Sequence, residues 1–140
     1  MKTDILIVGS GCSGLYCALN LPESRQITVI TKAGAEENDS YLAQGGMCML
    51  KDESDYQGFF DDTMKAGHYE NDEASVEIMI RSSRSVVEDL LQFGADFQRD
   101  ENGELVFTRE GAHSEKRIIF HKDVTGKEIT SKLLAQVKKL

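Results

Sequence analysis

Residues 5–15 constrain this chain more than any other stretch, because an apolar run leads directly into three glycines. Gly9, Gly11 and Gly14 have the spacing G-x-G-x-x-G. A continuous apolar run bounded by glycine predicts a strand buried on both faces. We expect Gly9 to permit a tight turn, Gly11 to let a phosphate approach the backbone, and Gly14 to let a helix pack against the strand.

The surroundings of these glycines are typical of a dinucleotide-binding unit. A helical stretch is predicted at 13–21, ended by Pro22, and a second strand at 27–31. The free amide groups at the start of a helix attract a diphosphate. The stretch therefore predicts a parallel β-α-β unit that binds a dinucleotide, with a purely structural glycine turn as the alternative.

The end of the second predicted strand argues against a nicotinamide cofactor. In NAD-binding folds this strand usually ends in an acidic residue that binds the ribose hydroxyls. Here it ends in Thr31-Lys32. A simple nicotinamide dehydrogenase is therefore the least favoured hypothesis.

Composition narrows the possible partners. The net charge of -8 and pI of about 4.9 do not provide the positive field that nucleic acid requires. No apolar run approaches the roughly 20 residues of a membrane span, and the first residues do not resemble a signal peptide. Cys12, Cys17 and Cys48 form no C-x-x-C pair, so we expect no disulfide, no metal site and a cytoplasmic location.

A glycine pair follows the polar segment 33–40, which is predicted to be a loop. Gln44 precedes Gly45 and Gly46, and adjacent glycines predict backbone that lies close to a flat or charged group. An ordinary turn is the alternative. A short strand is expected at 47–50.

Three helices are predicted beyond this point. The first covers about 54–65, the second begins after Asn71-Asp72-Glu73 and ends at Gly94, and the third begins at Thr125. Capping boxes, Ser54 with Gln57 and Thr125 with Glu128, are expected to open the first and third.

The apolar residues of these helices recur at helical spacing. Met79 belongs to the stripe of the second helix and is predicted to be core. Asn102-Gly103 predicts a hairpin between 96–98 and 105–108, and 118–120 is a candidate strand. The expected architecture is α/β: an incomplete parallel sheet with helices, plus a small β-hairpin.

Five segments in order resemble the N-terminal part of the succinate dehydrogenase and fumarate reductase flavoprotein superfamily. They are residues 8–14, 31–32, 40–46, 108–114 and 117–128. The fourth, Thr-Arg-Glu-Gly-Ala-His-Ser, is similar to the L-aspartate oxidases within that superfamily. The resemblance covers essentially the whole chain. It implies that residues 1–140 are the N-terminal segment of a Rossmann-like FAD-binding domain, with the capping domain and the rest of the sheet absent.

The resemblance also implies FAD as cofactor. Covalent relatives carry a histidine five residues before the glutamine, where this chain has Asp39, so non-covalent FAD is implied. The cofactor-binding residues implied are Gly9, Ser10, Gly11, Cys12, Ser13, Gly14, Lys32, Asp39, Ser40, Tyr41, Leu42, Ala43, Gln44, Gly45 and Gly46.

Glu110 is the catalytic-site residue that the resemblance implies. A carboxylate there would face the amino group of L-aspartate, an ion pair that a succinate-binding enzyme does not need. The alternative is a surface glutamate after a strand. The implied reaction is oxidation of L-aspartate to iminoaspartate in NAD biosynthesis, with oxygen or fumarate as acceptor, and we expect the 140-residue chain alone to lack turnover.

Other interpretations remain open at this point. The chain could derive from a fumarate reductase or succinate dehydrogenase flavoprotein, or act as a non-catalytic module that self-associates through an open strand edge. His113 and His121 could act as acid-base groups, although a structural role is the more ordinary expectation. A salt bridge is likewise expected for Arg109 and Arg117.

Overall fold

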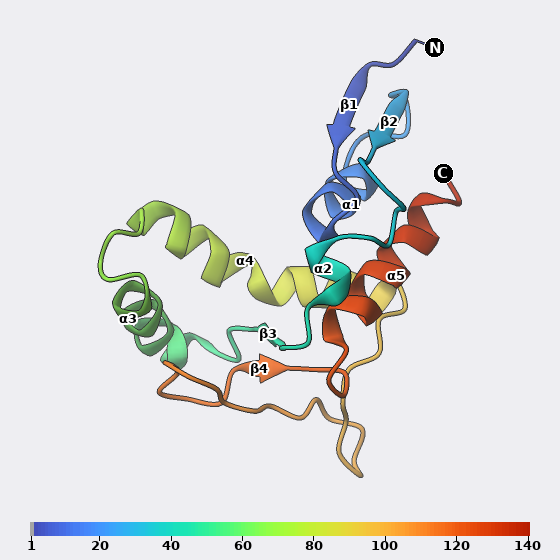
Figure 1. Cartoon of the computed structure of the whole chain (residues 1–140). Helices are drawn as coiled ribbons and strands as arrows, with labels where there is room; N and C mark the ends of the chain where they lie inside the picture. Colours follow the sequence, from blue (N-terminus) through green and yellow to red (C-terminus); the bar gives the residue numbers. More distant parts are fainter. Residues whose placement is uncertain (1) are drawn as a thin grey trace.

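The first two predicted strands pair in parallel in the computed structural model, which describes residues 2–140 and leaves Met1 outside the described residues. Strand β1 spans Ile5–Val8 and strand β2 spans Ile27–Ile30. Helix α1 (Cys12–Leu19) connects them and lies at their carboxyl ends (Figure 1). The β-α-β unit that the glycine spacing predicts is therefore confirmed.

The prediction that the first strand is buried on both faces is wrong. Ile7 faces α1, since its side chain lies 3.3 Å from where a Cβ on Gly14 would be. On the opposite face Leu6 is 54% exposed and Val8 is 77% exposed. Successive strand residues point to opposite faces, and no helix of the described chain covers this second face. In Figure 1 the two strands accordingly project beyond the rest of the chain, with α1 beside their carboxyl ends.

Helix α5 (Thr125–Val137) is central to the main core. It packs against α1 and against the short helix α2 (Asp39–Leu42), and it touches α4 (Glu73–Gln92) near the carboxyl end of that long helix. The polar segment predicted as loop therefore ends in one helical turn. The buried residues of this core are Leu15, Met49, Val87, Leu90, Ala95, Phe97, Ile119, Ile129, Leu133 and Leu134.

A second, smaller core lies at the other end of α4. Helix α3 (Tyr56–Ala66) follows a short 3-10 helix, η1 (Glu53–Asp55), and packs against the first half of α4 (Figure 1). Its buried members are Leu50, Phe59, Met64, Val76 and Ile80. Strands β3 (Met47–Cys48) and β4 (Ile118–Ile119) pair in antiparallel fashion between the two cores.

Neither predicted capping box forms. Asp52, not Ser54, caps the start of η1 by accepting a bond of 2.9 Å from the Ser54 amide. At α5 the Thr125 hydroxyl accepts from the His121 amide at 2.9 Å, and Glu128 accepts from the Asp96 amide at 2.8 Å. The side chains that could have capped α5 instead bind His121, just before this helix, and Asp96, just after α4.

The turns at Gly103 and Gly94 form as predicted, whereas one predicted core residue is exposed. The hairpin turn is confirmed, with an antiparallel bridge between Arg99 and Leu105 and a φ of +82° at Gly103. Gly94, at φ +91°, follows the last residues of α4 as expected. Met79 is 48% exposed, so the prediction that it is core is wrong. Its neighbours on α3 and β3 leave a cleft there.

Candidate FAD-binding and substrate site

The glycine-rich turn has the geometry that its spacing requires. Gly9 has a φ of +114°, and its amide donates to the carbonyl of Ile30 at 2.8 Å, which ties the turn to β2. A Cβ on Gly14 would overlap the Gly9 carbonyl oxygen. A Cβ on Gly11 would come within 3.0 Å of the Ser40 hydroxyl. Because Gly14 has no side chain, its backbone can pack closely against Gly9. Because Gly11 has none, another segment of the chain can approach it.

That other segment is the start of α2. The Ser40 hydroxyl accepts from the Cys12 amide at 3.2 Å, and the Asn38 amide group donates to the Ser10 carbonyl at 3.3 Å. Asn38 also caps α2, because its Oδ1 accepts from the Tyr41 amide at 3.0 Å. The turn 9–14 and the start of α2 are therefore in direct contact.

A cavity of about 500 Å³ opens where β1 and β2 end. Its walls include the turn at Gly9–Gly11, the strand end Thr31–Lys32, and residues 37–39. Ligands bind at the carboxyl ends of parallel strands in folds of this kind. The predicted site residue Lys32 lies in this wall. Glu37 places a carboxylate in the same cavity. It was not predicted from the sequence because it belongs to no recognisable motif.

The stretch from Ala43 to Gly46 continues along the surface from α2. The Ala43 carbonyl accepts from the Gly126 amide at 2.9 Å, which fastens the stretch to the start of α5. A Cβ on Gly46 would overlap Ile118 and the Ile119 carbonyl, whereas a Cβ on Gly45 would meet nothing within 4 Å. Gly46 is required by close packing on β4, and Gly45 leaves an open backbone surface.

Glu110 lies exposed on the loop that joins the hairpin to β4. Gly111, at φ +50°, turns the chain there, and the His113 amide donates to the Glu110 carbonyl at 3.2 Å. Burial raises the pKa of the Cys48 thiol, the positive charge of Arg117 opposes this, and the negative charge of Glu110 adds to it. Glu110 is therefore within electrostatic reach of Cys48, only two residues after Gly46.

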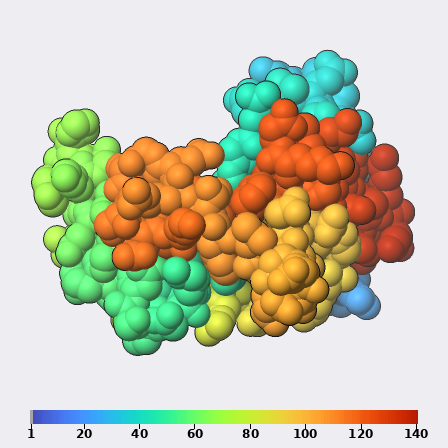
Figure 2. Space-filling view, turned by 90° about the horizontal axis from the view of Figure 1, so that it is seen from below, coloured from blue at the N-terminus to red at the C-terminus, as the bar shows by residue number. Residues whose placement is uncertain are grey.

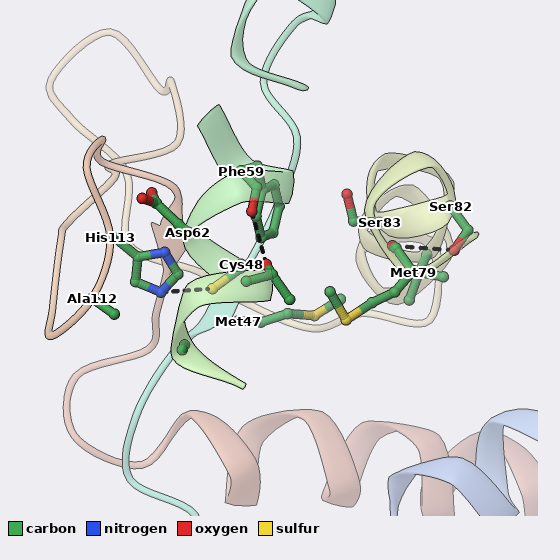
Figure 3. Close-up of a pocket in the computed structure, with 12 residues that line it drawn as sticks. Met47, Cys48, Phe59, Asp62, Met79, Ser82, Ser83, Ala112 and His113 are labelled. Atoms are coloured by element: carbon green, nitrogen blue, oxygen red, sulfur yellow. Dashed lines mark hydrogen bonds between the residues drawn. The ribbon is translucent and has the colours of Figure 1, made fainter. Parts of the chain in front are cut away.

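An apolar cleft of about 590 Å³ lies next to this loop, between α3, α4 and β3 (Figure 3). His113 forms part of its wall, with Nε2 at 3.4 Å from the Cys48 sulfur and its ring edge-on to Phe59. Met79 lies across the cleft. The imidazole of His121 contacts the Asp96 carbonyl at 2.7 Å.

Arg117 is fully buried and forms the salt bridges expected for it. Its guanidinium donates to both oxygens of Asp55, at 2.6 and 2.8 Å, and to Asp62 at 2.6 Å. Arg109 instead donates to the Ser114 carbonyl at 3.2 Å. In Figure 2 the loop before β4, in orange, covers part of α3, in green.

Several kinds of site are not found within residues 2–140. No group of three or more His, Cys, Asp or Glu side chains could hold a metal ion there. The cysteines of this region are free, and none of its helices is long and apolar enough to cross a membrane.

A β-α-β unit with a glycine turn, and a cavity where its parallel strands end, define a dinucleotide-binding α/β domain. The family model described as FAD binding domain matches residues 4–140. The chain therefore belongs to the FAD-binding domain family, and its cofactor is FAD.

Two proteins similar to this chain are L-aspartate oxidases. The chain is 46% identical over 136 residues to the L-aspartate oxidase of Clostridium perfringens, covering 97% of this chain and 31% of that protein. It is 43% identical over 139 residues to the L-aspartate oxidase of Clostridium acetobutylicum, covering 99% and 32%. The resemblance noted from the motifs is confirmed. The chain spans about a third of the length of these relatives.

Solved structures agree on the fold. The E. coli quinol fumarate reductase FrdA superposes with a TM-score of 0.93 at 22% identity, over 99% of this chain and 24% of that one. Mycobacterium smegmatis Sdh1 in complex with UQ1 superposes with a TM-score of 0.89 at 27% identity, over 99% and 25%. The fold is that of the FAD-binding domain in this superfamily of flavoproteins.

Proposed function

We propose that this chain is the FAD-binding N-terminal part of an L-aspartate oxidase, which converts L-aspartate to iminoaspartate with oxygen or fumarate as final acceptor. One contact supports this most directly: His113, three residues after Glu110, lies with its Nε2 at 3.4 Å from the sulfur of Cys48, which is two residues after Gly46. The loop that carries Glu110 thereby contacts β3, the strand that follows the Gln44–Gly46 stretch. The L-aspartate oxidase relatives support the choice of substrate.

The residues that meet at the strand ends suit a non-covalently held FAD. The backbone amides of Ser10–Ser13 lie at the start of α1, where a diphosphate is favoured. Lys32 and Glu37 would face the adenosine side, with Glu37 accepting from ribose hydroxyls in place of the acid missing from β2. The stretch 39–46 would line the diphosphate and the isoalloxazine. Bound FAD would supply the two-electron oxidant.

Glu110 is proposed to hold the amino group of the substrate. Its carboxylate is acceptor-only when ionised and would pair with an ammonium, which L-aspartate has and succinate lacks. An unpaired carboxylate in a succinate site would instead weaken binding of that dianion. Discrimination would thus come from one residue that attracts the correct substrate and repels the competitor.

A titration of the chain with FAD tests the assignment of the turn. The variant Ser13→Glu adds a negative charge in the first turn of α1, where it favours the helix but repels a diphosphate. We expect at least tenfold weaker FAD binding, followed by flavin fluorescence, while Ser24→Glu on the exposed loop before β2 binds as the unmodified chain does. Equal binding by both variants would contradict the assignment.

Substrate choice is tested in a chimera of the Clostridium perfringens L-aspartate oxidase that carries this chain in place of its matching segment. Glu110→Gln should lower kcat/KM for L-aspartate about 10- to 100-fold, as loss of a charged hydrogen bond does, and leave succinate inhibition intact or stronger. Glu115→Gln, an exposed residue of the same loop, is the matched control. No change in either variant would refute the role of Glu110.

A fumarate reductase or succinate dehydrogenase flavoprotein is the second candidate, favoured by the TM-scores above 0.8. The two functions differ in the same experiment. In a reductase, Glu110→Gln would alter fumarate reduction and the chimera would not oxidise L-aspartate.

A further inference from the structure

The loop that carries Glu110 is closed at its base by backbone bonds. The Thr108 amide donates to the Ile118 carbonyl at 2.8 Å, and the Ile118 amide donates back at 3.1 Å. Residues 109–116 form a mostly exposed excursion that includes Glu110 and Ser114. Such an excursion has no regular secondary structure to hold its far end.

A carboxylate of α3 makes three bonds near that far end. Asp62 accepts from the Ser114 amide at 2.6 Å, from the Ser114 hydroxyl at 2.7 Å, and from Arg117 at 2.6 Å. Its side chain is 16% exposed, so these bonds are partly shielded from water. All three bonds are accepted by the same oxygen, Oδ2 of Asp62.

The cation beneath the loop is itself held in place. Arg117 has no exposed surface, its fork is bonded to Asp55, and its guanidinium carbon lies 5.2 Å from the centre of the Phe59 ring. Its Nη2 also donates to the Ser114 hydroxyl at 3.2 Å. A buried cation with paired carboxylates is rigid, because each shift would expose an unpaired charge. The loop is therefore fixed to the body of α3 and not only to its own base.

We propose that Asp62 and Arg117 are positioning residues that set the carboxylate of Glu110 for the amino group of the substrate. This rests on the proposed function of Glu110. In this proposal Asp62 and Arg117 have no direct contact with the substrate. Each acts through Ser114, four residues after Glu110, and a displaced carboxylate loses binding energy steeply with distance.

The first test measures the loop in the chain itself, with no cofactor or substrate. Asp62→Asn keeps the shape of the side chain but weakens all three bonds. We expect hydrogen exchange of the amides of residues 110–114 to become at least tenfold faster, while the amides within α4 are unchanged. Asp61→Asn is the matched control, because Asp61 accepts only from Gln57 on the surface of the same helix.

The second test uses the chimeric oxidase described above, with activity expressed per bound flavin. Asp62→Asn should lower kcat/KM for L-aspartate about fivefold or more and leave succinate inhibition intact or stronger, as Glu110→Gln does, since succinate has no amino group to lose a partner. A purely structural role would weaken both L-aspartate turnover and succinate inhibition, or neither. Ser114→Ala, which removes only the hydroxyl, repeats the test if Asp62→Asn does not fold.

The outcomes separate the two proposals. If Glu110→Gln has no effect on L-aspartate, the proposed function fails and this inference fails with it. If Glu110→Gln lowers L-aspartate turnover but Asp62→Asn does not, the positioning role is overturned and the proposed function stands. Unchanged exchange of the loop amides in Asp62→Asn also overturns the positioning role.

Discussion

Acid titration of Asp62 gives a quantitative test of the loop anchor. Burial acts to raise the pKa of this carboxyl, but the bonds from Ser114 and Arg117 outweigh it and hold the pKa at about 2, below the ordinary value of 3.8. A carboxyl whose pKa is depressed in the folded state stabilises that state above the unfolded pKa. The stabilisation is lost as the pH falls from 3.8 through about 2.

The expected magnitude follows from these two values. A difference between 3.8 and about 2 corresponds to about 2 kcal/mol of unfolding free energy. Because the side chain of Asp62 is 16% exposed, solvent screening reduces this to about 1–2 kcal/mol. Roughly half of the contribution disappears between about pH 5 and about pH 3.

Urea unfolding followed by far-UV circular dichroism measures this contribution. The chain with Asp62→Asn should be less stable than the unmodified chain by about 1–2 kcal/mol near pH 5, and by about half as much near pH 3. Asp61→Asn should follow the unmodified chain at both values. If the curves for Asp62→Asn and the unmodified chain run parallel over this interval, Asp62 is not the anchor that its contacts indicate.

Three other outcomes are expected. In urea unfolding, Leu133→Ala should lower the unfolding free energy by about 2–5 kcal/mol, because Leu133 is only 1% exposed. Met79→Ala should change it by less than about 1 kcal/mol, because Met79 is 48% exposed. A thiol reagent near neutral pH should modify exposed Cys17 well before Cys48, since burial raises the pKa of Cys48. Light scattering should detect self-association of the chain at high concentration, and Val8→Lys on the uncovered sheet face should reduce it; a monomeric unmodified chain would contradict this.

Secondary structure was predicted correctly where it depends on residues that are close in sequence. Strands β1 and β2, helix α1 and the turn at Gly103 depend on residues a few positions apart, and each lies close to its expected place. The capping box predicted at α5 failed for the opposite reason. Glu128 is drawn to the amide of Asp96, which lies 32 positions away, and no local pattern reveals such a partner.

Burial was harder to predict than secondary structure. The helical stripe correctly identified Val87 and Leu90 but also included Met79, whose exposure depends on how α3 and β3 approach α4. The uncovered face of β1 was not predicted, because a parallel strand is buried only when helices cover both faces of its sheet, and the apolar run of β1 does not indicate whether they do. An apolar run indicates a strand that can be buried, not one that is.

The sequence by itself determined the glycine turn, the β-α-β order and the family, because these depend on residue types at short, fixed spacings. Only the tertiary structure decided which segments meet: Ser40 against Cys12, His113 against Cys48, and Arg117 buried between Asp55 and Asp62. These pairs are separated by at least 28 positions. Such contacts follow from how the helices pack around two cores, where the gain of burying whole faces outweighs any local preference.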